Sequence, residues 1–95
     1  MELEKDNNSA TAKYECSSEG FRCICHVKVT KAGIKITAQK GFDEHVPFSP
    51  GEELVFIRKA ENFQEALKIA EQLPQIAPED MERHSFIKTS QILYN

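Results

Sequence analysis

Tryptophan is absent from this chain of 95 residues, cysteine occurs only three times, and glycine and proline occur four times each. Because three is an odd number, the cysteines cannot all pair in a disulfide framework, and we expect reduced thiols. No stretch approaches the roughly 18 apolar residues that a membrane-spanning helix needs. The N-terminal residues also lack the basic and apolar segments of a secretion signal. The sequence therefore predicts a soluble, cytoplasmic protein without membrane association.

Motifs of the common catalytic sites are missing as well. The chain has no glycine-rich phosphate loop, no Gly-x-Ser-x-Gly elbow and no His-Glu-x-x-His motif. No cysteine begins an expected helix, which is where reactive thiolates are commonly found. Asp43 and Glu44, beside His45 in a loop that contains prolines, are expected to be solvated rather than catalytic. We therefore predict a protein that is not an enzyme and that needs no cofactor.

What the chain does contain is a sustained alternation of apolar and polar residues. Three consecutive segments place apolar side chains at every second position, which is typical of strands with one buried face. In the second segment Cys23, Cys25 and Val27 share the expected inner face, and Arg22 and Lys28 lie on the outer one. A fourth apolar segment has no polar face and is expected to be buried on both sides. We predict strands over residues 11–17, 21–31, 33–40 and 54–60.

A helix is predicted over residues 62–73, where the alternation gives way to helical spacing. Asn62 is a favoured N-cap residue, and Glu65 stands at the third helical position, where its carboxylate can reach back to the first turn. Pro74 ends the pattern. The apolar stripe of this helix, which we expect to pack on the sheet, consists of Phe63, Ala66, Leu67, Ala70 and Leu73.

The two ends of the chain give weaker signals. Residues 1–10 are polar and aperiodic and are expected to form a flexible arm, so that residues 11–95 make up the single domain. A second helix can begin at Pro78. For residues 85–94 we favour a helix over a strand. The predicted fold is thus α+β: an antiparallel meander of three to four strands, packed on one face by an amphipathic helix and followed by a short helix or an irregular tail.

A metal site is the first chemical hypothesis to weigh. Cys16, Cys23, Cys25 and His26 are residues of the kinds that bind zinc. Their spacing is unfavourable, because Cys23 and Cys25 lie one residue apart within a strand, whereas structural zinc sites commonly use a turn with a longer spacing. His26 would point to the opposite face. We therefore interpret the cysteines as small buried side chains, and keep a metal-binding protein as an alternative.

Charge is distributed unevenly along the chain. Residues 21–40 hold five bases and no acid, whereas residues 41–80 hold nine acids and three bases, within a chain of net charge −3. The bases, with one histidine, lie on or beside one face of the predicted ribbon, where they could contact nucleic-acid phosphates. This candidate nucleic-acid face consists of Arg22, His26, Lys28, Lys31 and Lys35.

Two functions follow from this distribution. The leading hypothesis is a small acidic module that binds and occludes a protein partner, as inhibitors, immunity proteins, antitoxins and phage-type inhibitors do. The partner would be a basic nucleic-acid-binding or nuclease protein, attracted by opposite charge. The alternative is a nucleic-acid-binding regulator, and homodimerisation is open in either case. The acidic candidates for the leading hypothesis are Asp43, Glu44, Glu52, Glu53, Glu61 and Glu65.

Overall fold

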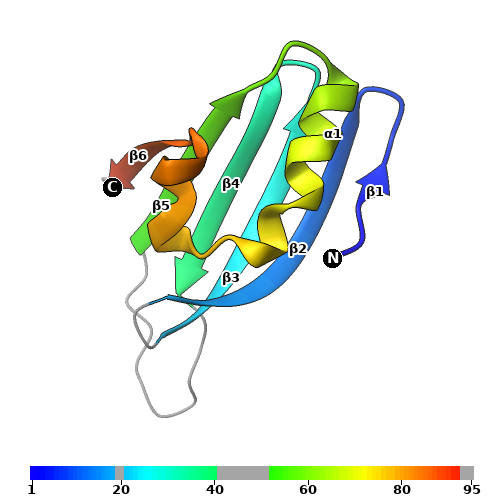
Figure 1. Ribbon diagram of the computed structural model, residues 1–95. Coiled ribbons are helices and arrows are strands. Elements are labelled where there is room, and N and C mark those ends of the chain that lie inside the picture. The colour runs from blue at the N-terminus through cyan, green and yellow to red at the C-terminus, as the bar shows by residue number, and fades with distance from the viewer. Residues whose placement is uncertain (19–20, 41–51, 93–95) are drawn as a thin grey trace.

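The computed structural model describes residues 1–18, 21–40 and 52–92, and an antiparallel sheet of six strands dominates it (Figure 1). Each strand pairs with the one before it in the sequence, so the sheet is a meander with β1 and β6 at its two edges. The strands are β1 (Glu4–Lys5), β2 (Ser9–Ser18), β3 (Phe21–Thr30), β4 (Gly33–Lys40), β5 (Glu52–Lys59) and β6 (Ile87–Ile92).

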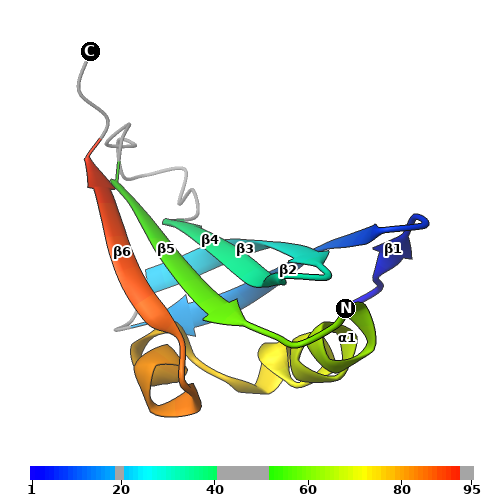
Figure 2. The ribbon, with the colours of Figure 1, turned by 90° about the horizontal axis from the view of Figure 1, so that it is seen from above.

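Three helical segments connect β5 to β6 and cover one face of the sheet (Figure 2). They are the helix α1 (Phe63–Glu71) and the two 3₁₀ segments η1 (Leu73–Gln75) and η2 (Pro78–His84). We call these segments the helical layer, and the uncovered side of the sheet the open face. In the described part of the chain, no helix is long and apolar enough to cross a membrane.

The predicted α+β class and antiparallel sheet are confirmed, but the number of strands is six rather than three to four. The additional strands lie at the two ends of the chain. Within residues 1–10, for which we expected a flexible arm, Glu4–Lys5 form β1, and β2 begins at Ser9. Ala10 is only 1% exposed. The N-terminal segment therefore contributes both a strand and a core residue.

The prediction of a helix after residue 85 is wrong. Ser85 has a left-handed backbone with φ of 68°, which ends η2, and the chain then extends along β5 as β6. Ile87 lies opposite Ile57, and Thr89 lies opposite Val55. Pairing with a strand distant in sequence decided the conformation of this segment, and no local pattern could supply that information.

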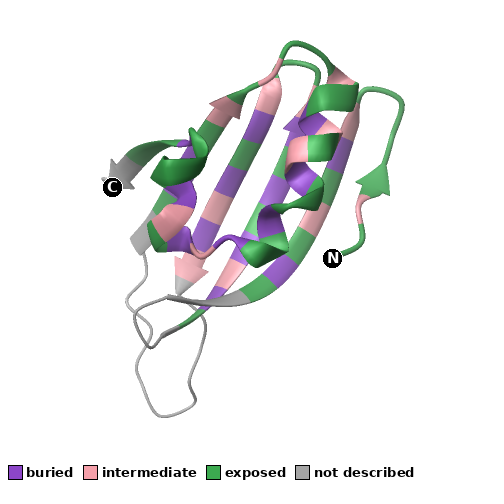
Figure 3. Cartoon of the chain, viewed as in Figure 1, coloured by how far each residue is buried: buried purple, intermediate pink, exposed green. Residues whose placement is uncertain are grey.

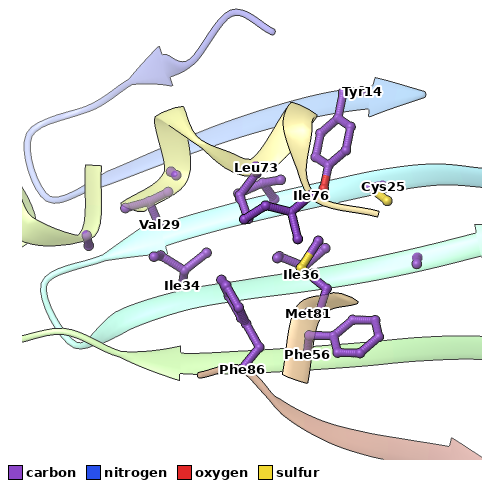
Figure 4. Packing of buried hydrophobic residues seen from close by; sticks show 14 of the residues in the cluster. Tyr14, Cys25, Val29, Ile34, Ile36, Phe56, Leu73, Ile76, Met81 and Phe86 are labelled. Atoms are coloured by element: carbon purple, nitrogen blue, oxygen red, sulfur yellow. The ribbon is translucent and has the colours of Figure 1, made fainter. Parts of the chain in front are cut away.

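The core lies between the covered face of the sheet and the helical layer (Figures 3 and 4). The alternation predicted from sequence is present, and Cys25 and Ile36 are fully buried on the covered face. Leu73 and Met81 reach them from η1 and η2 and are also fully buried. The small side chains of Ala66 and Ala70 allow α1 to approach the sheet closely; the full cluster includes Ala10, Tyr14, Val27, Val29, Ile34, Phe56, Ile76 and Phe86.

The fourth predicted strand is exposed more than its sequence suggested. Val55 and Phe56 of β5 are buried, but Leu54 is 38% exposed and Ile57 is 39% exposed. The strand was expected to be buried on both faces, yet the helical layer covers only one. Ile57 therefore presents an apolar side chain on the open face.

Side-chain and backbone contacts fix the helical layer in place. The Asn62 side chain accepts a hydrogen bond from the Glu65 backbone N–H at 2.8 Å, as its position predicts, and the Glu65 carboxylate accepts from the Glu61 N–H at 2.9 Å. Across the layer, the Arg58 guanidinium donates to the His84 carbonyl at 3.0 Å and lies 5.9 Å from the Phe86 ring centroid. The first two bonds stabilise the start of α1, and the Arg58 contacts attach the end of the layer to β5.

The burial of two cysteines leads to a first prediction. In a Cys16→Ser variant, the remaining Cys23 and Cys25, which are 7% and 0% exposed, should react with a thiol reagent only when the protein opens. Only the open fraction of the molecules reacts in native buffer. The labelling rate of the unfolded protein should therefore exceed the native rate by about the inverse of that fraction. Fast labelling of both thiols in native buffer would contradict the register, because a slip by one residue exchanges the two faces of a strand.

Candidate functional site

The open face carries most of the bases that the sequence analysis singled out. Arg22, His26, Lys28 and Lys35 are all exposed, and the register places them on the side opposite the helical layer. Lys31 is exposed in the turn that joins β3 to β4. Among the described side chains of the strands, the open face has five bases and two acids: Lys13, Arg22, Lys28, Lys35 and Lys59 against Glu4 and Glu15.

One row of side chains crosses four strands of this face. Lys28 of β3 lies opposite Lys35 of β4, Lys35 opposite Ile57 of β5, and Ile57 opposite Ile87 of β6. Ile57 is 39% exposed and Ile87 is 66% exposed. We call these four residues the lysine–isoleucine row. With neighbouring strands about 4.8 Å apart, the row is about 14 Å long, with two ammonium groups at one end and two apolar side chains at the other.

The two lysines of the row face each other, an unfavourable arrangement for like charges in a sheet. Across the neighbouring strands Lys28 has Thr11 beside it and Lys35 has Ile57, so neither has an opposed carboxylate. Nor does any ion pair within the described residues involve either of them. The positive charge at this end of the row is therefore not neutralised within the part of the chain that the structure describes.

A shallow hollow of about 340 Å³ adjoins the row at the β3–β4 turn. Lys28, Lys35 and Ile57 line it, together with Thr30, Ala32, Gly33, Ile34 and Arg58. Ligand pockets in proteins commonly have volumes of about 300–1,000 Å³, so this hollow is large enough for one or two side chains of a bound molecule. An apolar wall and two flanking ammonium groups suit an aliphatic side chain with carboxylates beside it.

The other predicted bases of the face are arranged differently. Arg22 forms an ion pair with Glu15 of β2, with an N–O distance of 3.1 Å, so its charge is balanced at the surface. His26 lies opposite Lys13 and Thr37, two positions along β3 from Lys28. His26 and Lys13 line a second hollow of about 520 Å³, and Glu2 and Glu4 line it as well. Both signs of charge meet there, so it has no clear preference for an anion or a cation.

The helical layer has the opposite charge. Residues 61–84 contain six acids and two bases, a net charge of −4. Glu61, Glu65, Glu71 and Glu82 are exposed, as is Glu79. Asp80 is partly buried and lies 3.9 Å from the Arg83 guanidinium. The molecule therefore presents an acidic helical layer on one side and a basic open face on the other.

Two of the six predicted acidic residues can be located on this layer. Glu61 and Glu65 lie at the start of α1, where the Glu65 carboxylate accepts a hydrogen bond from the Glu61 N–H. Glu52 and Glu53 are the first two residues of β5 and lie outside the helical layer. Asp43 and Glu44 lie outside the described residues. The exposed acids that extend the layer beyond α1 come from η2, and the charge count over residues 41–80 already indicated most of them.

Cys23 and Cys25 are not arranged with His26 around a common point. The backbone of Cys16 pairs with that of Cys23, and Cys23 and Cys25 are buried on the covered face, whereas His26 is exposed on the open face. In the described residues, no group of three or more histidine, cysteine, aspartate or glutamate side chains is placed to hold a metal ion. Burial of Cys23 and Cys25 in the core agrees with their interpretation as small apolar side chains.

Comparison of the chain with protein-family models, with curated proteins and with solved structures finds no match in any of the three. The class that the fold itself defines is an α+β protein with an antiparallel six-stranded meander covered on one face. Its function has to be inferred from the two charged surfaces.

Proposed function

We propose that this protein is a small non-enzymatic module of the cytoplasm that binds and occludes a protein partner through its acidic helical layer. It would act in the manner of an inhibitor, an immunity protein or an antitoxin. The observation that carries the proposal is the net charge of −4 on residues 61–84, displayed on the opposite side of the sheet from the bases. A partner with a basic surface, such as a nuclease or another nucleic-acid-binding protein, fits this charge.

The way the layer is held supports a role in binding. Leu73 and Met81 are fully buried beneath it, and the Arg58–His84 hydrogen bond ties its far end to β5. The acids of α1 and η2 are therefore carried on a backbone that is ordered before a partner arrives. Such preorganisation reduces the entropy lost on binding, and the opposite charge of the partner speeds the encounter.

The nucleic-acid alternative has weaker support from the described open face. Exposure of His26, Lys28 and Lys35 on one side favours it. However, Arg22 is paired with Glu15, and no described side chain on this face is a phenylalanine, tyrosine or tryptophan, so the imidazole of His26 is the sole aromatic ring among the described side chains there on which a base could stack. The net charge of the whole chain is also −3, whereas nucleic-acid-binding domains are usually basic.

Charge reversal on the helical layer tests the proposal. We expect the double variant Glu71→Lys/Glu82→Lys to retain about tenfold less of a basic partner than the wild-type chain when each is immobilised and exposed to a lysate of the source cells. Both residues are exposed, so the thermal midpoint should not move. Quantitative mass spectrometry of the retained proteins gives the readout.

The matched control is Glu2→Lys/Glu4→Lys, which changes the net charge by the same amount at the N-terminus, where both residues are exposed. It should retain the partner within about twofold of wild type. Equal losses in the two variants would show that only the total charge matters, and no loss in either would remove the acidic layer as the binding surface.

A further inference from the structure

We infer that the open face is a second binding surface, and that the lysine–isoleucine row docks an acidic segment of another protein. The segment would place carboxylates on Lys28 and Lys35 and aliphatic side chains on Ile57 and Ile87. This surface lies on the opposite side of the sheet from the acidic helical layer. The inference is therefore independent of the function proposed above.

Charge complementarity identifies the occupant. Lys28 and Lys35 face each other across two strands, and their charges are not neutralised by any described side chain. A pair of carboxylates placed between them would replace repulsion by attraction. Because the lysines are exposed, this attraction affects mainly the choice of partner and its rate of encounter.

The apolar end of the row supplies most of the binding free energy, because exposed lysines contribute little affinity by themselves. Ile57 and Ile87 lie opposite each other and are 39% and 66% exposed. Covering them removes apolar surface from water, which is favourable at about 25 cal/mol per Å². The hollow of about 340 Å³ between Lys28, Lys35 and Ile57 can hold one aliphatic side chain of the segment.

The same features disfavour two other occupants. A second copy of the chain, packed row against row, would set the Lys28–Lys35 pair against the same pair or against Ile57 and Ile87, and neither arrangement gives the lysines a carboxylate. A nucleic acid would gain phosphate contacts from the lysines, but Ile57 and Ile87 cannot stack on bases as aromatic side chains do. An acidic protein segment uses both ends of the row.

The test uses a synthetic peptide as the probe. In an extended segment every second side chain points to the same face, and residues i to i+4 span about 13 Å, close to the length of the row. The probe therefore contains Glu-Ser-Glu-Ser-Leu between serine residues, and its control contains Lys-Ser-Lys-Ser-Leu. NMR titration of the isotope-labelled chain should show shifts confined to Lys28, Lys35, Ile57 and Ile87 and their neighbours with the first peptide, and at least about tenfold weaker binding of the second.

Variants locate the interaction. Lys28→Glu/Lys35→Glu should weaken binding of the acidic peptide by about tenfold or more, and Ile87→Ser by about threefold. The matched control is Lys5→Glu/Lys68→Glu, which changes the net charge by the same amount in β1 and α1, where both lysines are exposed. It should leave the affinity within about twofold. Circular dichroism of each variant verifies that the fold is intact.

Three results would overturn the inference. The first is absence of shifts with the acidic peptide, which would leave the lysines as surface charges that only prevent aggregation. The second is tighter binding of a single-stranded or duplex oligonucleotide at about 50 mM salt, lost steeply as salt rises, which would assign the face to nucleic acid. The third is a concentration-dependent mass in sedimentation that Ile57→Ser abolishes, which would assign it to a second copy.

Discussion

Replacement of Leu73 by alanine is expected to lower the free energy of unfolding by about 2–5 kcal/mol. Leu73 is fully buried in η1 and packs beside Ile36 and Ile76 at the centre of the core (Figure 4). Truncation removes most of its apolar contact and leaves a cavity between the sheet and the helical layer. Chemical denaturation monitored by circular dichroism measures the change.

Leu67→Ala provides the matched comparison, because the same atoms are removed from the same helical stripe. Leu67 is only partly buried, so we expect a clearly smaller cost, on the order of 1 kcal/mol. A larger loss for Leu67→Ala than for Leu73→Ala would mean that the helical layer is rotated relative to the sheet.

Gly33→Ala is expected to destabilise the protein by about 1–3 kcal/mol. Gly33 has φ of +149°, a backbone conformation that is strained for any residue with a side chain. A Cβ at this position would also collide with the Arg58 carbonyl of β5 and lie 3.0 Å from the Lys59 Cα. The backbones of β4 and β5 approach closely here, and β5 cannot move without disturbing the hydrogen bond from Ala60 to Ala32.

Ala32→Ser is the control for Gly33→Ala, since Ala32 is exposed in the same turn and should change stability by less than about 0.5 kcal/mol. Thermal and denaturant unfolding of both variants give the comparison. If Gly33→Ala were as harmless as Ala32→Ser, the turn and the β4–β5 register would have to differ from those described.

The parts of the fold that could be predicted from sequence are those governed by local patterns. Alternation from Phe21 to Thr30 placed Cys25 in the core and Lys28 on the outer face, and the structure agrees. Asn62 and Glu65 marked the start of α1 in the same way. In each case neighbouring residues contain the information, because burial of one face and capping of the first turn act over a few positions.

The parts that could not be predicted depend on pairing between distant segments. Ile87–Ile92 becomes a strand because β5 offers a free edge, and the short β1 depends on β2 in the same way. The residues of the lysine–isoleucine row divide in the same way, between those given by a local pattern and those given by strand pairing. The lysines of the row were found from their charge and alternation, whereas Ile57 and Ile87 meet only through the β5–β6 pair and were missed.

The central claim is that a partner binds to the acidic helical layer, and carboxyl footprinting tests it most directly. Carbodiimide coupling of an amine to exposed carboxylates, read by mass spectrometry, would be compared for the free chain and for the chain bound to its captured partner. We predict protection of Glu71 and Glu82, which are exposed in the free protein, with no change at Glu4. Full reactivity of Glu71 and Glu82 in the complex would contradict the claim.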